Sequence, residues 1–388
     1  MPPSKTNADP TTATVVTSAS FVPRPLLAAP TFDGMDLGPA LIEAFGALPE
    51  GATLQRLKGD ASTRSYYRLD VPGRDPLIVM RLPADALKAD EGSSDARPTE
   101  LPFINVQRHL AGRGVPVPHV LVDHTSRGVL LLEDLGDETF EARLKKHEPA
   151  GYRELYAQAV DVMAAMHRAC SVRDDACIAY GRSFDRKLLC WELDHFREWG
   201  LEAVGVTLSA EQRSELDACF DKLVTAMLEL PQGFVHRDYQ SRNLMWAPRD
   251  QLVVIDFQDA LCGPAVYDLV ALMCDSYLDL DETLQRDMIL HLAQLRGESA
   301  EALERAFWLV TVQRKLKDAG RFVFIDQVRG NPDFLPWYAP SLRYVGRALA
   351  HLPEYEPLAR LLREHLPGFP EQVRAPAAMT SAHTGRSL

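Results

Sequence analysis

The stretch that decides the fold reads His236-Arg237-Asp238-Tyr239-Gln240-Ser241-Arg242-Asn243 and is followed closely by Ile255-Asp256-Phe257. Phosphoryl transfer needs a carboxylate that orients the attacking hydroxyl and accepts its proton, and oxygen ligands that hold Mg²⁺ against the nucleotide phosphates. Asp238 fits the catalytic role, and Asn243 and Asp256 fit the metal role. Residues 244–246 and 252–255 predict a β-hairpin that folds Asp256 back beside Asp238. The spacing therefore predicts a kinase catalytic loop.

A structural interpretation of the same residues also exists. In it, residues 236–238 cap a helix or form a surface loop, and Asp256 only ends a strand. His236 is expected to pack beneath the loop and to hydrogen-bond its backbone, and His167 to be a core histidine. Asp268 is expected at the N-cap of a helix over 269–273, where its carboxylate can also brace the catalytic loop.

Composition predicts a globular protein whose main partner is neither nucleic acid nor an anionic membrane. The 388 residues are 46% hydrophobic, which is enough to bury a substantial core. A formal net charge of -12 argues against nucleic acid or an anionic membrane as a partner, because both select a basic surface. The six cysteines form neither a CxxC pair nor a metal-ligand cluster, which is typical of reduced thiols in a cytoplasmic protein.

The spacing of the apolar residues changes once along the chain, from β-like to helical. Short β-like runs predict a nucleotide-binding N-lobe over 33–136, with strands at 54–57, 65–69, 77–82, 120–123 and 129–132 and a helix at 100–112. Helical spacing then predicts a catalytic and substrate-binding C-lobe over 137–370. The ends, 1–32 and 371–388, are expected to be disordered tails, and the acid-poor start also allows a transit peptide. The predicted fold class is α+β, a bilobal protein-kinase-like fold.

The N-lobe supplies most of the residues expected to bind ATP. They are Gly59, Ser62, Thr63, Arg64, Arg81, Glu100, Glu133 and Leu135. Backbone N–H groups near Gly59, with two hydroxyls and the charge of Arg64, can meet phosphate oxygens in the first hairpin. Arg81 stands where protein kinases carry a phosphate-binding lysine, with Glu100 as its expected partner. The backbone from 133 to 135 is expected to bond adenine.

Alternatives remain for two of these features. The first hairpin also fits an ordinary polar turn, and Arg81 also fits an exposed charge at a strand end, so its replacement of the usual lysine stays open. The insertion over 85–98 is expected to be a mobile loop near the nucleotide.

Residues for the acceptor are expected mainly in the C-lobe. Recognition of a sugar needs carboxylates, amides and cations that bond hydroxyls, and an aromatic face for the ring. The candidates are Glu192, Trp199, Arg242, Asp259, Gln313, Arg314 and Lys317. Gln313 and Lys317 lie four residues apart and so share a helix face, although a solvated charged face fits equally. Arg242 fits either a product phosphate or an ion pair with a neighbouring carboxylate.

The chain resembles the aminoglycoside phosphotransferase and choline kinase superfamily, and within it the bacterial anomeric kinases of N-acetylmuramate and N-acetylglucosamine. The segments that carry the resemblance are Gly59-Asp60-Ala61-Ser62-Thr63-Arg64-Ser65-Tyr66-Tyr67-Arg68, residues 236–245, Ile255-Asp256-Phe257-Gln258-Asp259-Ala260 and Gln313-Arg314-Lys315-Leu316-Lys317-Asp318-Ala319-Gly320. The resemblance spans about 37–352. It implies ATP-dependent, Mg²⁺-assisted phosphorylation of the anomeric hydroxyl and a sugar 1-phosphate that a nucleotidyltransferase uses in cell-wall recycling.

Departures from that family leave the sugar and its anomer open. They are Arg81, Arg321-Phe322 and the insertion over 85–98. Two other functions also remain: a kinase of an aminoglycoside, choline or a related amine, which an acidic cleft would favour, and a non-catalytic nucleotide-binding regulator. The complete set of Asp238, Asn243 and Asp256 argues against the regulator.

Overall fold

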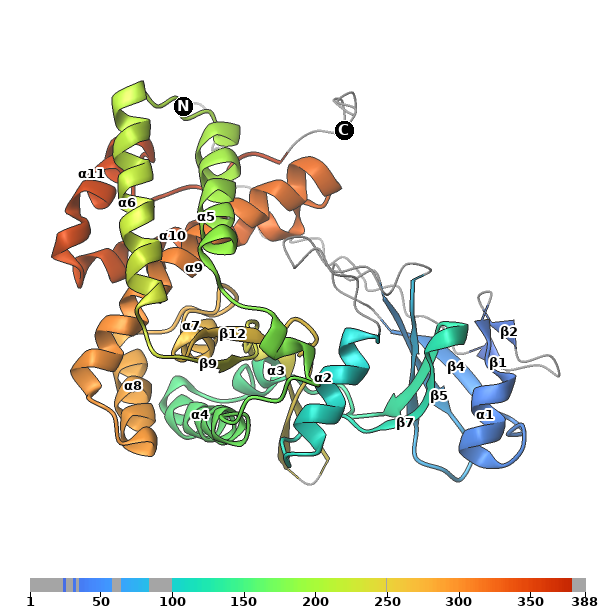
Figure 1. The fold of residues 1–388 in the computed structure, drawn as a ribbon. Helices are drawn as coiled ribbons and strands as arrows, with labels where there is room; N and C mark the ends of the chain where they lie inside the picture. The colour runs from blue at the N-terminus through green and yellow to red at the C-terminus, as the bar shows by residue number, and fades with distance from the viewer. Residues whose placement is uncertain are drawn as a thin grey trace, which may run out of the picture. The chain divides into compact units, whose positions relative to one another are not determined.

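The computed structural model describes residues 24–25, 31–32, 35–57, 64–83, 100–248 and 250–378. Contacts divide them into two compact units. The first contains the described residues up to 83 together with 121–134, and the second contains 100–120 and 135–378. Figure 1 shows that the first unit is built on a sheet and the second mainly on helices, which confirms the α+β class.

A six-stranded sheet forms the first unit, in the order β1-β4-β5-β6-β8-β7. The strands are β1 (Arg24–Pro25), β4 (Thr53–Arg56), β5 (Ser65–Asp70), β6 (Leu77–Arg81), β7 (Val120–His124) and β8 (Val129–Glu133). Antiparallel register sets Leu54 against Leu69 and Val79 against Leu131, so alternate side chains enter one apolar core. Helix α1 (Gly38–Phe45) adds Leu41 to this core. A short pair, β2 (Thr31–Phe32) with β3 (Met35–Asp36), precedes that helix.

The first strand corrects the tail predicted over 1–32. Arg24 and Pro25 pair in the sheet with Leu54 and Thr53, so part of this segment belongs to the unit. A two-residue edge strand that contains proline joins a sheet through backbone groups and leaves no alternating pattern in the sequence. The five predicted strands are present, and β1 makes the sixth.

Helices dominate the second unit. They are α2 (Pro102–Ala111), α3 (Phe140–Leu144), α4 (Tyr152–Ala169), α5 (Arg186–His195), α6 (Ala210–Leu228), α7 (Tyr267–Met273), α8 (Glu282–Arg296), α9 (Ala300–Arg329), α10 (Tyr338–Ala350) and α11 (Glu356–His365). Helix α9 is buried along much of its length and packs closely against the π-helical segment Phe196–Leu201 that continues α5. A Cβ on Gly320 would lie 2.8 Å from the Cα of Phe196, so this crossing requires glycine. None of the described helices is both long enough and apolar enough to cross a membrane.

Helix α2 groups with the second unit rather than with the sheet. Phe103 stacks on Phe257 with ring centroids 5.0 Å apart, and the side chain of Asn105 bonds the backbone of Ala176 and Ile178. The predicted N-lobe ran without interruption to 136, whereas these contacts place 100–120 with the helical unit. The anchoring residues are distant in sequence, so a periodicity analysis could not assign the helix to its unit.

Candidate active site

Two antiparallel strand pairs position the catalytic loop, residues 236–243. Strand β9 (Gln232–Val235), which pairs with β12 (Leu261–Pro264), leads into the loop, and a 3₁₀ turn over Ser241–Asn243 leads out of it. Strands β10 (Leu244–Ala247) and β11 (Gln251–Val254) then form the predicted hairpin. The Ile255 N–H donates to the Asn243 carbonyl over 3.0 Å, and an Asp256 carboxylate oxygen lies 3.4 Å from the Asn243 amide nitrogen. The prediction that the hairpin returns Asp256 to the loop is confirmed.

Buried polar groups hold the start of the loop. His236 Nε2 lies 2.9 Å from the Ile255 carbonyl, as expected for a structural histidine. The Asp268 carboxylate accepts the backbone N–H groups of His236 and Arg237 over 2.8 and 2.9 Å and lies 2.7 Å from His167 Nε2. These contacts confirm the expected bracing by Asp268 and the core role of His167.

The N-cap assignment of Asp268 is wrong. Val266 is the N-cap of α7, and Asp268 lies within the first turn of that helix. Its carboxylate serves the catalytic loop because two loop N–H groups are buried there and need an acceptor. Burial raises the pKa of Asp268, but the hydrogen bond from His167 and neighbouring charges outweigh it and lower this pKa overall.

Arg237 has a left-handed backbone, with φ of 78°. This conformation is unfavourable for a side chain such as arginine and persists when surrounding contacts determine it. Asp268 accepts the Arg237 N–H, and Arg314 donates to its carbonyl over 2.6 Å. The loop is therefore clamped on both sides of the residue that precedes Asp238.

Arg314 also contacts the predicted catalytic residue. Its Nη2 donates to Asp238 Oδ1 over 3.1 Å, and the two side chains are 4% and 35% exposed, respectively. Burial raises the pKa of Asp238, but the charges of Arg314, Lys317 and Arg237 lower it to about 2. Asp238 is therefore an ionised, weakly basic carboxylate at neutral pH, suited to orienting a hydroxyl.

Asn243 and Asp256 fit a magnesium site. The Asn243 amide nitrogen donates to the Asp238 carbonyl over 2.9 Å, which leaves the amide oxygen for a cation. Gln258 Nε2 donates to Asp256 Oδ1 over 2.8 Å and fixes that carboxylate. Within the described part of the chain, no group of three or more His, Cys, Asp or Glu side chains could hold a metal. A kinase site needs fewer, since phosphate oxygens complete the oxygen coordination that Mg²⁺ prefers.

Glu192 and Gln313 form a buried polar cluster beside the loop. The Glu192 carboxylate accepts from Gln313 Nε2 over 2.7 Å and from Arg237 Nη2 over 3.3 Å. Helices α5 and α9 are thereby joined to the catalytic loop. The structure brings these two predicted acceptor residues together, and Glu192 also pairs with Arg237.

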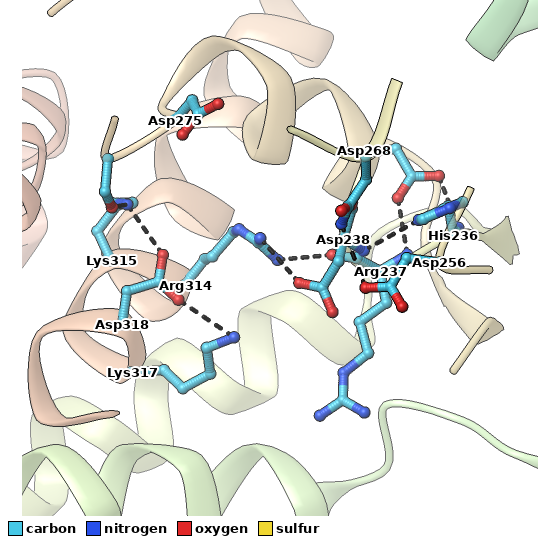
Figure 2. Close-up of polar contacts among 12 residues, drawn as sticks. His236, Arg237, Asp238, Asp256, Asp268, Asp275, Arg314, Lys315, Lys317 and Asp318 are labelled. Atoms are coloured by element: carbon cyan, nitrogen blue, oxygen red, sulfur yellow. Dashed lines mark hydrogen bonds and ion pairs between the residues drawn. The ribbon is translucent and has the colours of Figure 1, made fainter. Parts of the chain in front are cut away.

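Three cations and one carboxylate lie close together on α9. Figure 2 shows Asp318 between Lys315 and Lys317, while Arg314 reaches the loop that carries Asp238. Asp318 Oδ2 lies 2.9 Å from the Lys315 amine, and Oδ1 lies 3.2 Å from the Lys317 amine. Burial raises the pKa of Asp318, and the three cations 314, 315 and 317 outweigh this and lower it. An otherwise acidic chain thus concentrates positive charge near its catalytic carboxylate.

The remaining predicted acceptor residues are more dispersed. Arg242 pairs with Glu141 over 2.9 Å and lies over the Tyr277 ring, so the ion-pair alternative is the one observed. Asp259 is half-buried and accepts from Gln258 Nε2 over 3.2 Å. Trp199 packs edge-on against Phe324 with centroids 5.2 Å apart.

The predicted nucleotide-binding residues belong to both units. Gly59, Ser62 and Thr63 lie outside the described residues, as does the insertion over 85–98. In the first unit, Arg64 immediately precedes β5, Arg81 ends β6 and Glu133 ends β8. In the second unit, Leu135 is buried against Ala247 and Val253. Glu100 makes a two-pronged ion pair with Arg108, and its pairing with Arg81 stays a prediction.

Sequence reasoning missed two residues that shape the site. Gln258 orients the Asp256 carboxylate, and Asp318 balances the cations of α9. Gln258 lies two residues beyond Asp256, so proximity in the sequence could have indicated it. Asp318 carried a weaker signal, because an acid among lysines on a helix usually marks a solvated face.

The fold, the hairpin and the loop carboxylate define a phosphotransferase with a protein-kinase-like fold. Residues 53–307 match the model of the phosphotransferase enzyme family, and the chain belongs to that family. It is therefore a kinase-type enzyme.

Two relatives and one solved structure place the chain within this class. An N-acetylmuramate/N-acetylglucosamine kinase of Pseudomonas aeruginosa is 34% identical over an alignment of 333 residues that covers 82% of this chain and 90% of the relative. The protein of the same name from Neisseria meningitidis is 30% identical over an alignment of 314 residues that covers 79% of this chain and 88% of the relative. A choline/ethanolamine kinase family protein from Mesorhizobium loti has a TM-score of 0.52 at 17% identity, covering 80% of this chain and 92% of its own. The last similarity concerns the fold alone.

Proposed function

We propose that this phosphotransferase uses ATP to phosphorylate the anomeric hydroxyl of an amino sugar, N-acetylmuramate, N-acetylglucosamine or both, and releases the sugar 1-phosphate. One observation carries the chemistry: Asp238 is a clamped, ionised carboxylate beside the oxygen ligands of Asn243 and Asp256. The amino-sugar class is supported by relatives of that name, which match along most of their length.

In this proposal Asp238 acts mainly by orienting the acceptor hydroxyl. A carboxyl group with a pKa of about 2 is a weak base, so it holds the acceptor hydroxyl and takes its proton late, when the bond to phosphorus is forming. An anomeric hydroxyl suits such a base because it is more acidic than an ordinary alcohol. Arg314 stabilises the charged form of the carboxylate and holds it in place.

Asn243 and Asp256 would hold Mg²⁺ through the amide oxygen and the carboxylate. In that place the metal would supply positive charge to offset the charge of the nucleotide phosphates. Gln258 keeps the Asp256 carboxylate in position for this role. We further propose that Arg64, Arg81 and the segment around Gly59 contact the phosphates, and that the backbone from Glu133 to Leu135 contacts adenine. Glu192, Gln313 and Lys317 remain our proposed residues near the acceptor.

The alternative acceptors are cations, namely aminoglycosides and choline. Three cations lower the pKa of Asp238, and Lys317 and Arg314 lie on one helix beside it. Positive charge next to the attacking group disfavours a cationic acceptor and favours a neutral or anionic one. The local electrostatics therefore support a sugar over an amine.

We propose a cytoplasmic location, supported by the six cysteine thiols, which are free. The 1-phosphate product has the form that a nucleotidyltransferase consumes, which would link the enzyme to cell-wall sugar recycling.

A radiolabelled ATP assay over N-acetylmuramate, N-acetylglucosamine, glucose, choline and kanamycin tests the function. Turnover of an N-acetylated amino sugar, and of neither amine, is the expected result. Turnover confined to choline or kanamycin would overturn the proposal.

A further inference from the structure

We infer that Lys317 is the ligand for a carboxylate on the acceptor, and that it makes the enzyme prefer a carboxylated amino sugar to its uncharged counterpart. The inference rests on the proposed function and deepens it. N-acetylmuramate and N-acetylglucosamine provide the comparison, because the first carries a lactyl carboxylate and the second carries none.

The cations around the catalytic loop differ in the hydrogen bonds and ion pairs that they already make. Arg314 donates to the Arg237 carbonyl and to Asp238, so its guanidinium is used within the loop. Arg237 pairs with Glu192, and Arg242 pairs with Glu141 and covers a tyrosine ring. An acceptor carboxylate at any of these three groups would compete with a partner that already helps to shape the site.

Lys317 has spare hydrogen-bond capacity. An ammonium group has three N–H donors. Among the residues that the structure describes, Asp318 is the only partner of Lys317, through one contact of 3.2 Å. Two donors therefore remain on a side chain that is 16% exposed, so the charge is largely desolvated.

Lys317 also lies near the catalytic carboxylate (Figure 2). Its charge is the second largest favourable influence on the Asp238 carboxylate, after Arg314 and ahead of Arg237. Figure 2 shows Lys317 and Arg314 reaching from one helix toward the loop. An acceptor hydroxyl held at Asp238 would therefore bring the rest of a hexose derivative near the Lys317 amine.

Asp318 stabilises the charge of the Lys317 ammonium before a substrate binds. Its carboxylate is shared between Lys315 and Lys317, one oxygen to each. Burial lowers the pKa of Lys317, and Asp318 with other negative groups more than offsets this and raises it. The ammonium thus stays charged without consuming all of its donors.

The test compares Lys317→Met with the wild type on N-acetylmuramate, its methyl ester and N-acetylglucosamine. We expect the ratio of kcat/KM for N-acetylmuramate to that for N-acetylglucosamine to fall about tenfold or more, since a hydrogen bond between charged groups is lost. Wild-type enzyme should favour the free acid over the ester, and the variant should lose most of that preference. At pH 7.5, removing one cation raises the pKa of Asp238 but leaves it ionised, and this change in base strength acts on all three substrates alike, so it would not alter these ratios.

Controls separate charge recognition from structural damage. Lys317→Arg keeps the cation and should retain most of the preference for the acid. Lys222→Met removes a lysine on α6 that bonds the Glu354 carbonyl, and should leave both ratios unchanged.

Equal losses on all three substrates, or unchanged ratios, would overturn the inference. If the wild type turned over none of these sugars, the proposed function would fail. Calorimetry of the acid and the ester in the presence of a non-hydrolysable ATP analogue would still decide the inference. Tighter binding of the acid that disappears in Lys317→Met would support it, and equal binding of the two would refute it.

Discussion

Replacing Arg314 with methionine removes the clamp on the catalytic carboxylate while keeping an unbranched side chain in place of the arginine stem. Arg314 donates to Asp238 and to the Arg237 carbonyl, and it is the largest of the charges that lower the pKa of Asp238. We expect kcat to fall about 10- to 100-fold, the scale of a misplaced reacting group, with little change in the acceptor KM. Arg314 is therefore assigned as a positioning residue.

The same substitution should raise the pKa of Asp238. In the wild type, the pKa of Asp238 is lowered from the ordinary 3.8 to about 2. At about 1.36 kcal/mol per pH unit, this shift would correspond to about 2.4 kcal/mol in favour of the charged form. Solvent screens a carboxylate that is 35% exposed, so we take roughly 1 kcal/mol as the part lost with Arg314. Because the folded pKa lies below the unfolded one, this stabilisation is present above the unfolded pKa and is lost as the pH falls toward 2.

Two measurements distinguish positioning from general destabilisation. Carboxyl-carbon NMR titration should show the Asp238 resonance, identified by its absence in Asp238→Asn, titrating at higher pH in Arg314→Met. When Arg314→Met is added to Asp238→Asn, kcat should fall by less than about a further threefold, since the two residues act as a unit. A large rise in acceptor KM with unchanged kcat would refute this reasoning, because Arg314 would then bind the acceptor directly.

Three further substitutions test the rest of the site. Asp238→Asn should remove almost all turnover while calorimetry still detects ATP binding, because the amide keeps the shape and cannot accept a proton; near-normal turnover would contradict the catalytic assignment. Asp256→Ala should abolish Mg²⁺-dependent nucleotide binding, and unchanged affinity would mean that other groups hold the metal. Asp268→Asn should lower the free energy of unfolding by roughly 2–4 kcal/mol at neutral pH, because two buried loop N–H groups lose a charged acceptor. Since the folded pKa of Asp268 is lowered, urea titrations should show this difference shrinking in acid, and a difference independent of pH would exclude Asp268 as an ionised brace.

The catalytic loop could be predicted because its geometry is local. Asp238, Asn243 and Asp256 lie within one loop and one hairpin, so spacing alone fixes which residues meet. The strands of the first unit could also be predicted from the sequence, since their alternating apolar residues face one core.

Long-range contacts could not be predicted in the same way. Arg314 and Asp238 are 76 positions apart, and Arg237 and Glu192 are 45 apart, so nothing in the local pattern pairs them. The sequence predicted both Glu192 and Arg314 near the acceptor, but the structure shows that each also holds the loop. Asp268 was assigned to a helix cap because propensity describes the local backbone and carries no information on buried N–H groups elsewhere.

The position of the transferred phosphate tests the central claim most directly. After reaction of ATP with N-acetylmuramate or N-acetylglucosamine, phosphorus NMR should show coupling to the anomeric proton, and the product should be acid-labile. The 1-deoxy analogue of the same sugar should not be phosphorylated. Phosphorylation of the 1-deoxy analogue at a comparable rate, or a product without coupling to the anomeric proton, would show that another hydroxyl is the acceptor.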